Sequence, residues 1–535
     1  MQQFDDILLK IGQIGWYQFA LALLISLHEV NSCWSMLVLI FIGADPGWTC
    51  SENVQNGNTT TSGPQLFSTL KTLDISNGSD TFSAENNSQC GMCSNYDFNT
   101  EFTSIVTEWD LVCDNDFISD TISSLQMAGV LAGCLLFGQI GDTLGRKKAY
   151  FAAILLTSSM ALGQYFTTAW YQFAVLRFFN GIGIGGCLVT GFTWSIEFLG
   201  PKYRPVVIVL GIWPMASLIF LAIAYFIRDW RTVQLITPFP GFLLLGTWWV
   251  LPESPRWLLS RGRYDEVVTI ATRIAKRNNK KLPDMDLFIK QHEKERAMEN
   301  HETRFGFWDL FRSPDLTVVT LKNMFVWFSM SLFNYGVFFN LKNLPGDRYT
   351  NMAINFGVSY ASAVISYLSL RRFGRRIITT VGLFFGFICV IPIFTLFLLG
   401  LYAQLWLVIS ILTSLATTAV SVGWYALYIL TSEQYPTPIR NIGLGFSSMT
   451  ARIAAILAPL MAYLTKYWDA FPFVLSGTFA LLSGVVTIFM EETRDKPLED
   501  TVPEKQWCFC GQQKVDVGVK TDNDISLNDI GANYI

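Results

Sequence analysis

Residues 138–147, Gly138-Gln139-Ile140-Gly141-Asp142-Thr143-Leu144-Gly145-Arg146-Lys147, form a short charged connection between two apolar segments. These segments, 119–141 and 149–168, each have the length of about 20 mainly apolar residues that crosses a bilayer as a helix. The connection ends in the basic run Arg146-Lys147-Lys148. Because positively charged residues stay on the cytoplasmic side of a membrane, this run predicts a helix-loop-helix whose loop lies inside the cell.

The composition of the whole chain agrees with membrane helices. Of 535 residues, 51% are hydrophobic and 15% are charged, whereas soluble domains carry about 25% charged residues. This excludes disorder and an ordinary soluble enzyme. The net charge of −4 offers no basic field for nucleic acid. The chain has no phosphate-binding loop of an ATP-driven pump and no His-rich metal motif, so we expect no enzyme, no metal and no cofactor.

Reading the chain for segments of spanning length predicts an all-α membrane protein with 12 transmembrane helices. The expected spans are 16–42, 119–141, 149–168, 171–198, 205–227, 231–251, 317–340, 350–370, 377–400, 403–431, 438–465 and 471–490.

The polar segment 43–118 carries two signs of an extracellular loop. Its three N-x-[ST] glycosylation sequons are Asn58, Asn77 and Asn86. Its four clustered cysteines, Cys50, Cys90, Cys93 and Cys113, fit an oxidising compartment. We expect two disulfides there, and four cysteines leave three pairings open.

The segment 253–316 carries many of the chain's basic residues, which puts it on the opposite side of the membrane. With the loop outside and twelve spans, the basic segments and both termini fall in the cytoplasm. We therefore expect these parts: cytoplasmic N-terminus 1–15, N-terminal six-helix half 16–251, cytoplasmic basic linker 252–316, C-terminal six-helix half 317–490 and cytoplasmic tail 491–535.

Charged residues at the predicted cytoplasmic helix ends recur in both halves. Glu197 and Arg204 stand seven residues apart, as do Glu433 and Arg440. Two six-helix pseudo-repeats in parallel orientation are typical of one transporter class. These charges predict a cytoplasmic gate that latches neighbouring helices and opens during transport; ordinary helix-end charges are the alternative. The predicted gate residues are Asp142, Arg146, Glu197, Arg204, Arg375, Glu433 and Arg440.

These motifs resemble those of a known family. The loop at 138–147 is similar to the signature loop of the major facilitator superfamily, and Pro252-Glu253-Ser254-Pro255-Arg256-Trp257-Leu258 resembles its mid-chain motif. The segments 197–204 and 433–441, with the large first loop, are similar to the organic cation/anion/zwitterion transporters of solute carrier family 22, closest to the zwitterion and carnitine-type members. The resemblance implies the major facilitator fold.

Two ionisable residues are predicted near the middle of the membrane, where charges are costly and mark functional sites. Arg452 lies twelve residues beyond Arg440, and Glu29 thirteen residues into the first span. A guanidinium is a bidentate partner for a carboxylate, and a site with one charge of each sign suits a zwitterion. The family resemblance implies a basic residue at the position of Arg452 in anion and carnitine-type members. A structural role for Arg452, as an ion pair with Glu29 or beside a helix dipole, is the alternative.

Aromatic faces can hold quaternary ammonium groups. The resemblance singles out Tyr335 and Tyr428 as substrate-binding candidates, while simple packing is the alternative for each aromatic residue. The remaining aromatic candidates are Trp213, Trp327, Phe328, Trp424 and Tyr425.

Together these features predict an alternating-access secondary transporter in the plasma membrane, with a small organic ion as its partner. Zwitterions of carnitine or betaine type come first, organic monoanions second and organic cations third. A non-transporting receptor on the same scaffold is the rival from another class. The sequence leaves open whether an ion is co-transported or exchanged.

Overall fold

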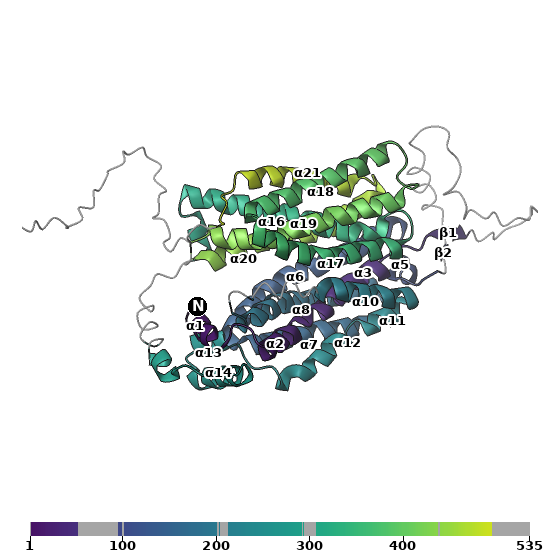
Figure 1. The fold of residues 1–535 in the computed structure, drawn as a ribbon. Helices are drawn as coiled ribbons and strands as arrows, with labels where there is room; N and C mark the ends of the chain where they lie inside the picture. The colour runs from purple at the N-terminus through teal and green to yellow at the C-terminus, as the bar shows by residue number, and fades with distance from the viewer. Residues whose placement is uncertain are drawn as a thin grey trace, which may run out of the picture.

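Two helical bundles make up the protein and lie side by side along their length (Figure 1). The computed structural model describes residues 2–51, 95–98, 101–200, 203, 212–290, 293, 306–436 and 439–494. The first bundle is built from the N-terminal part of the chain and the second from the C-terminal part, so the predicted division into two halves is visible in the arrangement of the helices.

The N-terminal bundle follows the first six predicted spans. Its helices are α2 (Trp16–Ser26), α3 (His28–Ile42), α6 (Phe117–Leu144), α7 (Arg146–Tyr165), α8 (Trp170–Glu197), α10 (Ile212–Phe226), α11 (Trp230–Ile236), α12 (Phe239–Leu245) and the 3-10 turn η3 (Gly246–Trp249). The expected fifth span began at 205, and its first residues, up to 211, lie outside the described residues.

The C-terminal bundle follows the other six. Its helices are α16 (Pro314–Asn340), α17 (Arg348–Arg372), α18 (Arg375–Leu398), α19 (Trp406–Gln434), α20 (Arg440–Tyr463) and α21 (Phe471–Ile488), with the short turns η5 (Leu341–Asn343) and η7 (Leu464–Lys466). Within the described part of the chain, nine helical segments are long and apolar enough to span a membrane; the other three predicted spans correspond to α7, α10 and the divided segment α11–α12.

The first span, Trp16–Ile42, has a one-residue irregularity at Leu27, and the sixth span is divided into two short helices. In the first, the Ile25 carbonyl accepts the Tyr150 hydroxyl at 2.9 Å and contacts His28 Nδ1 at 2.8 Å. These side chains take up a carbonyl that would otherwise bond within the helix, and the helix is interrupted at Leu27. In the sixth span, Pro238 has no N–H to donate, and the helix restarts at Phe239.

Small elements distinguish the two ends of the bundle (Figure 1). We call one the loop end: β1 (Trp48–Ser51) pairs antiparallel with β2 (Asn95–Phe98), and α5 (Ile105–Glu108) and η1 (Cys113–Asn115) follow. We call the other the linker end. It carries α1 (Gln2–Ile11), α13 (Pro255–Ser260), α14 (Tyr264–Arg277) and η4 (Phe307–Phe311).

Helices α6 and α8 pack with their backbones in close contact. A Cβ atom added to Gly133 would lie 2.0 Å from the Ile182 carbonyl oxygen, and one added to Gly181 would lie 2.2 Å from that of Gln126. Such small residues let membrane helices approach closely. This contact fixes the position of α6, whose linker end holds residues 138–144; only Gly145 separates it from α7, so the predicted loop at 138–147 is mostly helical.

Candidate substrate site and gates

Arg452 lies on α20 where the two bundles meet. Its side chain is half-buried, and its Nη1 donates to the Tyr335 hydroxyl at a long 3.5 Å. Tyr428 of α19 and Cys134 of α6 are close enough to interact electrostatically with the Arg452 guanidinium. No carboxylate among the residues that the structure describes forms an ion pair with Arg452, so the alternative of an ion pair with Glu29 is not seen. Its guanidinium therefore keeps donors for a ligand.

Glu29 comes from the opposite bundle, one residue after the start of α3. It is half-buried and lies beside the backbone of Trp213 on α10. Across the interface, its carboxylate is within electrostatic range of Tyr425 on α19. No cation in the described part of the chain pairs with Glu29.

Helix α19 has one tyrosine near each of these two charges. Tyr425, near Glu29, and Tyr428, near Arg452, are three residues apart, so they share a face of the helix. Each tyrosine is half-buried. The arrangement brings an acid from one half and a base from the other to a single helical turn of α19.

The other aromatic candidates divide into two groups. Trp424 stays near Tyr428, with 6.4 Å between ring centroids. The ring centroids of Trp327 and Tyr428 are 4.5 Å apart. Trp327 is fully buried and its Nε1 already donates to Thr431, so it packs against Tyr428 and has no free donor for a ligand. Phe328 packs against Phe479 of α21, in a separate cluster. This packing does not support the prediction that Phe328 contacts the substrate.

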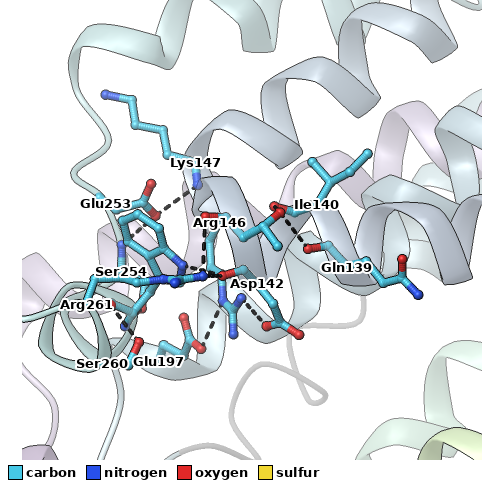
Figure 2. Close-up of polar contacts among 12 residues, drawn as sticks. Gln139, Ile140, Asp142, Arg146, Lys147, Glu197, Glu253, Ser254, Ser260 and Arg261 are labelled. Atoms are coloured by element: carbon cyan, nitrogen blue, oxygen red, sulfur yellow. Dashed lines mark hydrogen bonds and ion pairs between the residues drawn. The ribbon is translucent and has the colours of Figure 1, made fainter.

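At the linker end, the predicted gate charges of the N-terminal half form a connected group (Figure 2). Arg146 Nη1 lies 2.5 Å from Asp142 Oδ1, and Arg146 Nε lies 3.4 Å from Glu197 Oε1. The backbone carbonyl of Asp142 accepts from Trp257 Nε1 at 2.9 Å and from Arg261 Nη2 at 2.7 Å. These contacts join α6, α7, α8 and the linker helix α13 within one half.

The C-terminal half repeats part of this group. Arg375 Nε lies 3.4 Å from Glu433 Oε2. Arg440 is the first residue of α20, and its side chain also has an interaction partner. Arg204, the fourth member predicted for the first half, lies outside the described residues. The pairs seen here join helices of the same half, and their role in gating stays a prediction.

Each group of gate charges contains one further glutamate that was not among the predicted gate residues. Glu253 Oε1 accepts the Lys147 backbone N–H at 3.0 Å, and Glu492 Oε1 accepts that of Arg375 at 3.0 Å. Each carboxylate therefore sits at the N-terminus of an equivalent helix, α7 or α18, where negative charge is favourable. The common signal is a Glu after the sixth span of each half.

A further set of contacts, also missed, joins the two halves at the loop end. Lys342 Nζ lies 2.7 Å from Asp120 Oδ1, and both side chains are largely buried. Lys466 also pairs with Asp116, through side chains that are more exposed. The Arg348 guanidinium lies 3.7 Å from the centre of the Phe102 ring. We call these three contacts the loop-end latch. No sequence pattern could pair them, because their partners are more than two hundred residues apart.

Most of the predicted glycosylation and disulfide sites lie outside the residues that the structure describes. The three sequon asparagines, Asn58, Asn77 and Asn86, lie outside the described residues, as do Cys90 and Cys93. Cys113 is disulfide-bonded. Nothing is described of the Cys50 side chain, so the pairing stays a prediction.

Comparison with known proteins places this architecture in a family. The model of the "Sugar (and other) transporter" family matches residues 78–503. An organic cation transporter protein of Drosophila melanogaster is 30% identical over 523 residues, covering 94% of each chain. The human organic cation/carnitine transporter 2 is 31% identical over 405 residues, 75% of this chain and 72% of that protein. Human solute carrier family 22 member 13 is 30% identical over 527 residues, 94% and 93% of the two chains.

Solved structures share the fold. The inward-open xylose transporter XylE from E. coli is similar with a TM-score of 0.61 and 17% identity, over 90% of this chain and 98% of that one. These transporters, the matched family and the two-bundle architecture agree with one another. The chain is a membrane transporter with the major facilitator fold, and it belongs to the sugar and other transporter family and, within it, to solute carrier family 22.

Proposed function

We propose that this transporter moves small organic zwitterions of carnitine or betaine type across the plasma membrane by alternating access. The observation that supports this most directly is the pair of unneutralised charges at the interface. Arg452 from the C-terminal half and Glu29 from the N-terminal half both lack a charged protein partner in the described part of the chain. Leaving two such charges half-buried is costly unless a ligand pairs with them.

The chemistry of each charge suits one end of a zwitterion. The Arg452 guanidinium can bind a carboxylate with two parallel hydrogen bonds. Glu29 and the nearby Tyr425 ring can attract an ammonium group through charge and cation–π contact. Because the two groups belong to different halves, a bound zwitterion touches both, and its binding is coupled to their relative movement.

We further propose that the linker end is cytoplasmic and the loop end extracellular. The basic linker and the sequon-bearing loop support this orientation. The loop-end latch joins the halves at the loop end. In this orientation the loop-end latch lies on the extracellular side.

An organic cation is the second candidate, supported by the printed names of the relatives. The Drosophila protein is an organic cation transporter, and the human relative an organic cation/carnitine transporter. Glu29 alone would serve such a substrate. A monoanion would use Arg452 alone.

Uptake measurements test the proposal. Cells expressing the chain are given a labelled betaine-type zwitterion, a monoanion and a monocation, with surface expression verified and vector-only cells as background. We expect saturable uptake of the zwitterion that unlabelled zwitterion inhibits. Saturable uptake of the monocation alone would show that the substrate class is wrong. Uptake of none of the three by surface-expressed protein would contradict a transporter of these ions.

A further inference from the structure

A pocket of about 410 Å³ lies at the linker end, away from the substrate site. Its walls come from the end of α6, the start of α7, η3 and α14. A volume of this size accommodates a small polar ligand. The pocket is not part of the transport path described above, because all its lining residues belong to the N-terminal half and the linker.

The pocket is lined by four basic residues and two carboxylates, and two of the basic residues have no charged partner in the described part of the chain. Its two carboxylates are already engaged: Glu253 Oε1 accepts backbone N–H groups of Lys147 and Ser254, and Glu266 pairs with Arg263. Lys148 and Arg273 are exposed and form no hydrogen bond or ion pair within the described part of the chain. The lining basic residues are Lys147, Lys148, Arg263 and Arg273.

One wall of the pocket is apolar, and an exposed aromatic residue adjoins it. Leu144 and Trp248 line it, and they are 56% and 37% exposed. Trp249 follows directly and is 84% exposed. Lys147 Nζ lies 4.8 Å from the centre of the Trp248 ring, so a basic group and an interfacial aromatic ring face the same space. Tryptophan is enriched where membrane helices meet the lipid headgroups.

We propose that this pocket binds the phosphorylated headgroup of an anionic membrane phospholipid of the phosphoinositide class. Lysine ammonium and arginine guanidinium groups are the side chains that recognise phosphate, and basic pockets at the cytoplasmic ends of membrane helices bind such headgroups. The exposed apolar wall supplies a path for the acyl chains, which a soluble phosphate lacks. The ligand would contact α6, α7 and α14 together and so hold the linker against the N-terminal half. That the pocket faces the cytoplasmic leaflet of the membrane follows from the orientation proposed above.

Calorimetry with the purified full-length protein tests the site without requiring transport. A short-chain phosphatidylinositol bisphosphate is titrated into wild type and into the double variant Lys148→Gln/Arg273→Gln. Each lost charge should weaken binding about fivefold, so the double variant should bind roughly 25-fold more weakly. The matched control is Lys280→Gln/Lys281→Gln, which removes the same charge from exposed linker residues outside the pocket; it should bind like wild type.

Inositol trisphosphate, the headgroup without acyl chains, separates the two possible sources of phosphate. We expect it to bind more weakly than the short-chain lipid. Equal binding of both would overturn the lipid assignment in favour of a soluble phosphorylated anion. Unchanged lipid binding by the pocket variant, or equal losses in the pocket and control variants, would overturn the site. Because the readout is lipid binding, failure here leaves the substrate proposal untouched.

Discussion

Two arginines inside the bundle show how surroundings decide a residue's role. Arg177 of α8 is fully buried, and it donates to the Ser35 carbonyl at 2.9 Å and to Gln234 Oε1 at 3.1 Å. Both of its terminal nitrogens are thus engaged within the N-terminal half, where they brace α8 against α3 and α11. Arg452, in contrast, has one long hydrogen bond to Tyr335. The first arginine is structural, and the second is available for a ligand.

Replacing Arg177 with Met should therefore reduce stability. Gln234 Oε1 would lose its buried hydrogen-bond partner, at a cost of about 1–3 kcal/mol, whereas the Ser35 carbonyl would keep the hydrogen bond that it accepts from Gln126. We expect a lower melting temperature of the purified protein in detergent. Arg371→Met, at an exposed helix end, is the control and should melt like wild type. An unchanged melting temperature for Arg177→Met would show that this brace contributes little.

At the scale of helices, the α6–α8 contact should tolerate no side chain. A leucine at Gly133 would clash with the backbone of Ile182, which cannot rotate away as a side chain could. Overpacking of this kind costs about 1–3 kcal/mol. We expect Gly133→Leu to lower the melting temperature and the amount of folded protein. Gly357→Leu on α17, where a Cβ meets nothing within 4 Å, should be harmless. Equal behaviour of both variants would contradict the close contact.

The helices show what a single sequence can and cannot predict. The spans and their order followed from long apolar segments, since each must bury its backbone polar groups in lipid as a helix. The break at Leu27 did not follow, because it depends on the Tyr150 hydroxyl, which reaches Ile25 from another helix. For the site, Arg452 and Glu29 were found because charge in a span is conspicuous. Glu253 could be recognised only as part of the 252–258 motif, because the Lys147 backbone N–H that it accepts lies 106 residues away.

At the scale of the whole molecule, the loop-end latch should hold the described conformation. Two largely buried charges, Asp120 and Lys342, meet across the halves, and placing like charges there should separate them. We expect Asp120→Lys to favour the state that is open at the loop end. In a Tyr349→Cys background, this should speed labelling by a membrane-impermeant maleimide.

The exchanged pair provides the control for the latch. Asp120→Lys combined with Lys342→Asp restores opposite charges and should return labelling toward the rate of the Tyr349→Cys background alone. Fast labelling in the exchanged pair as well would mean that Asp120→Lys acts through local disruption. Labelling unaffected by Asp120→Lys would show that the ion pair does not set the conformational equilibrium.

If charges from opposite halves form one substrate site, as we propose, equilibrium binding to purified protein should depend on Arg452. Binding of a labelled betaine-type zwitterion is measured for wild type, Arg452→Gln, Arg452→Lys and the exposed control Arg371→Gln. Hydrogen bonds to charged groups contribute about 1.5–3 kcal/mol, so Arg452→Gln should bind roughly tenfold to 100-fold more weakly. Arg452→Lys should recover part of the affinity, and Arg371→Gln should match wild type. Undiminished binding by correctly folded Arg452→Gln would show that Arg452 does not bind the substrate.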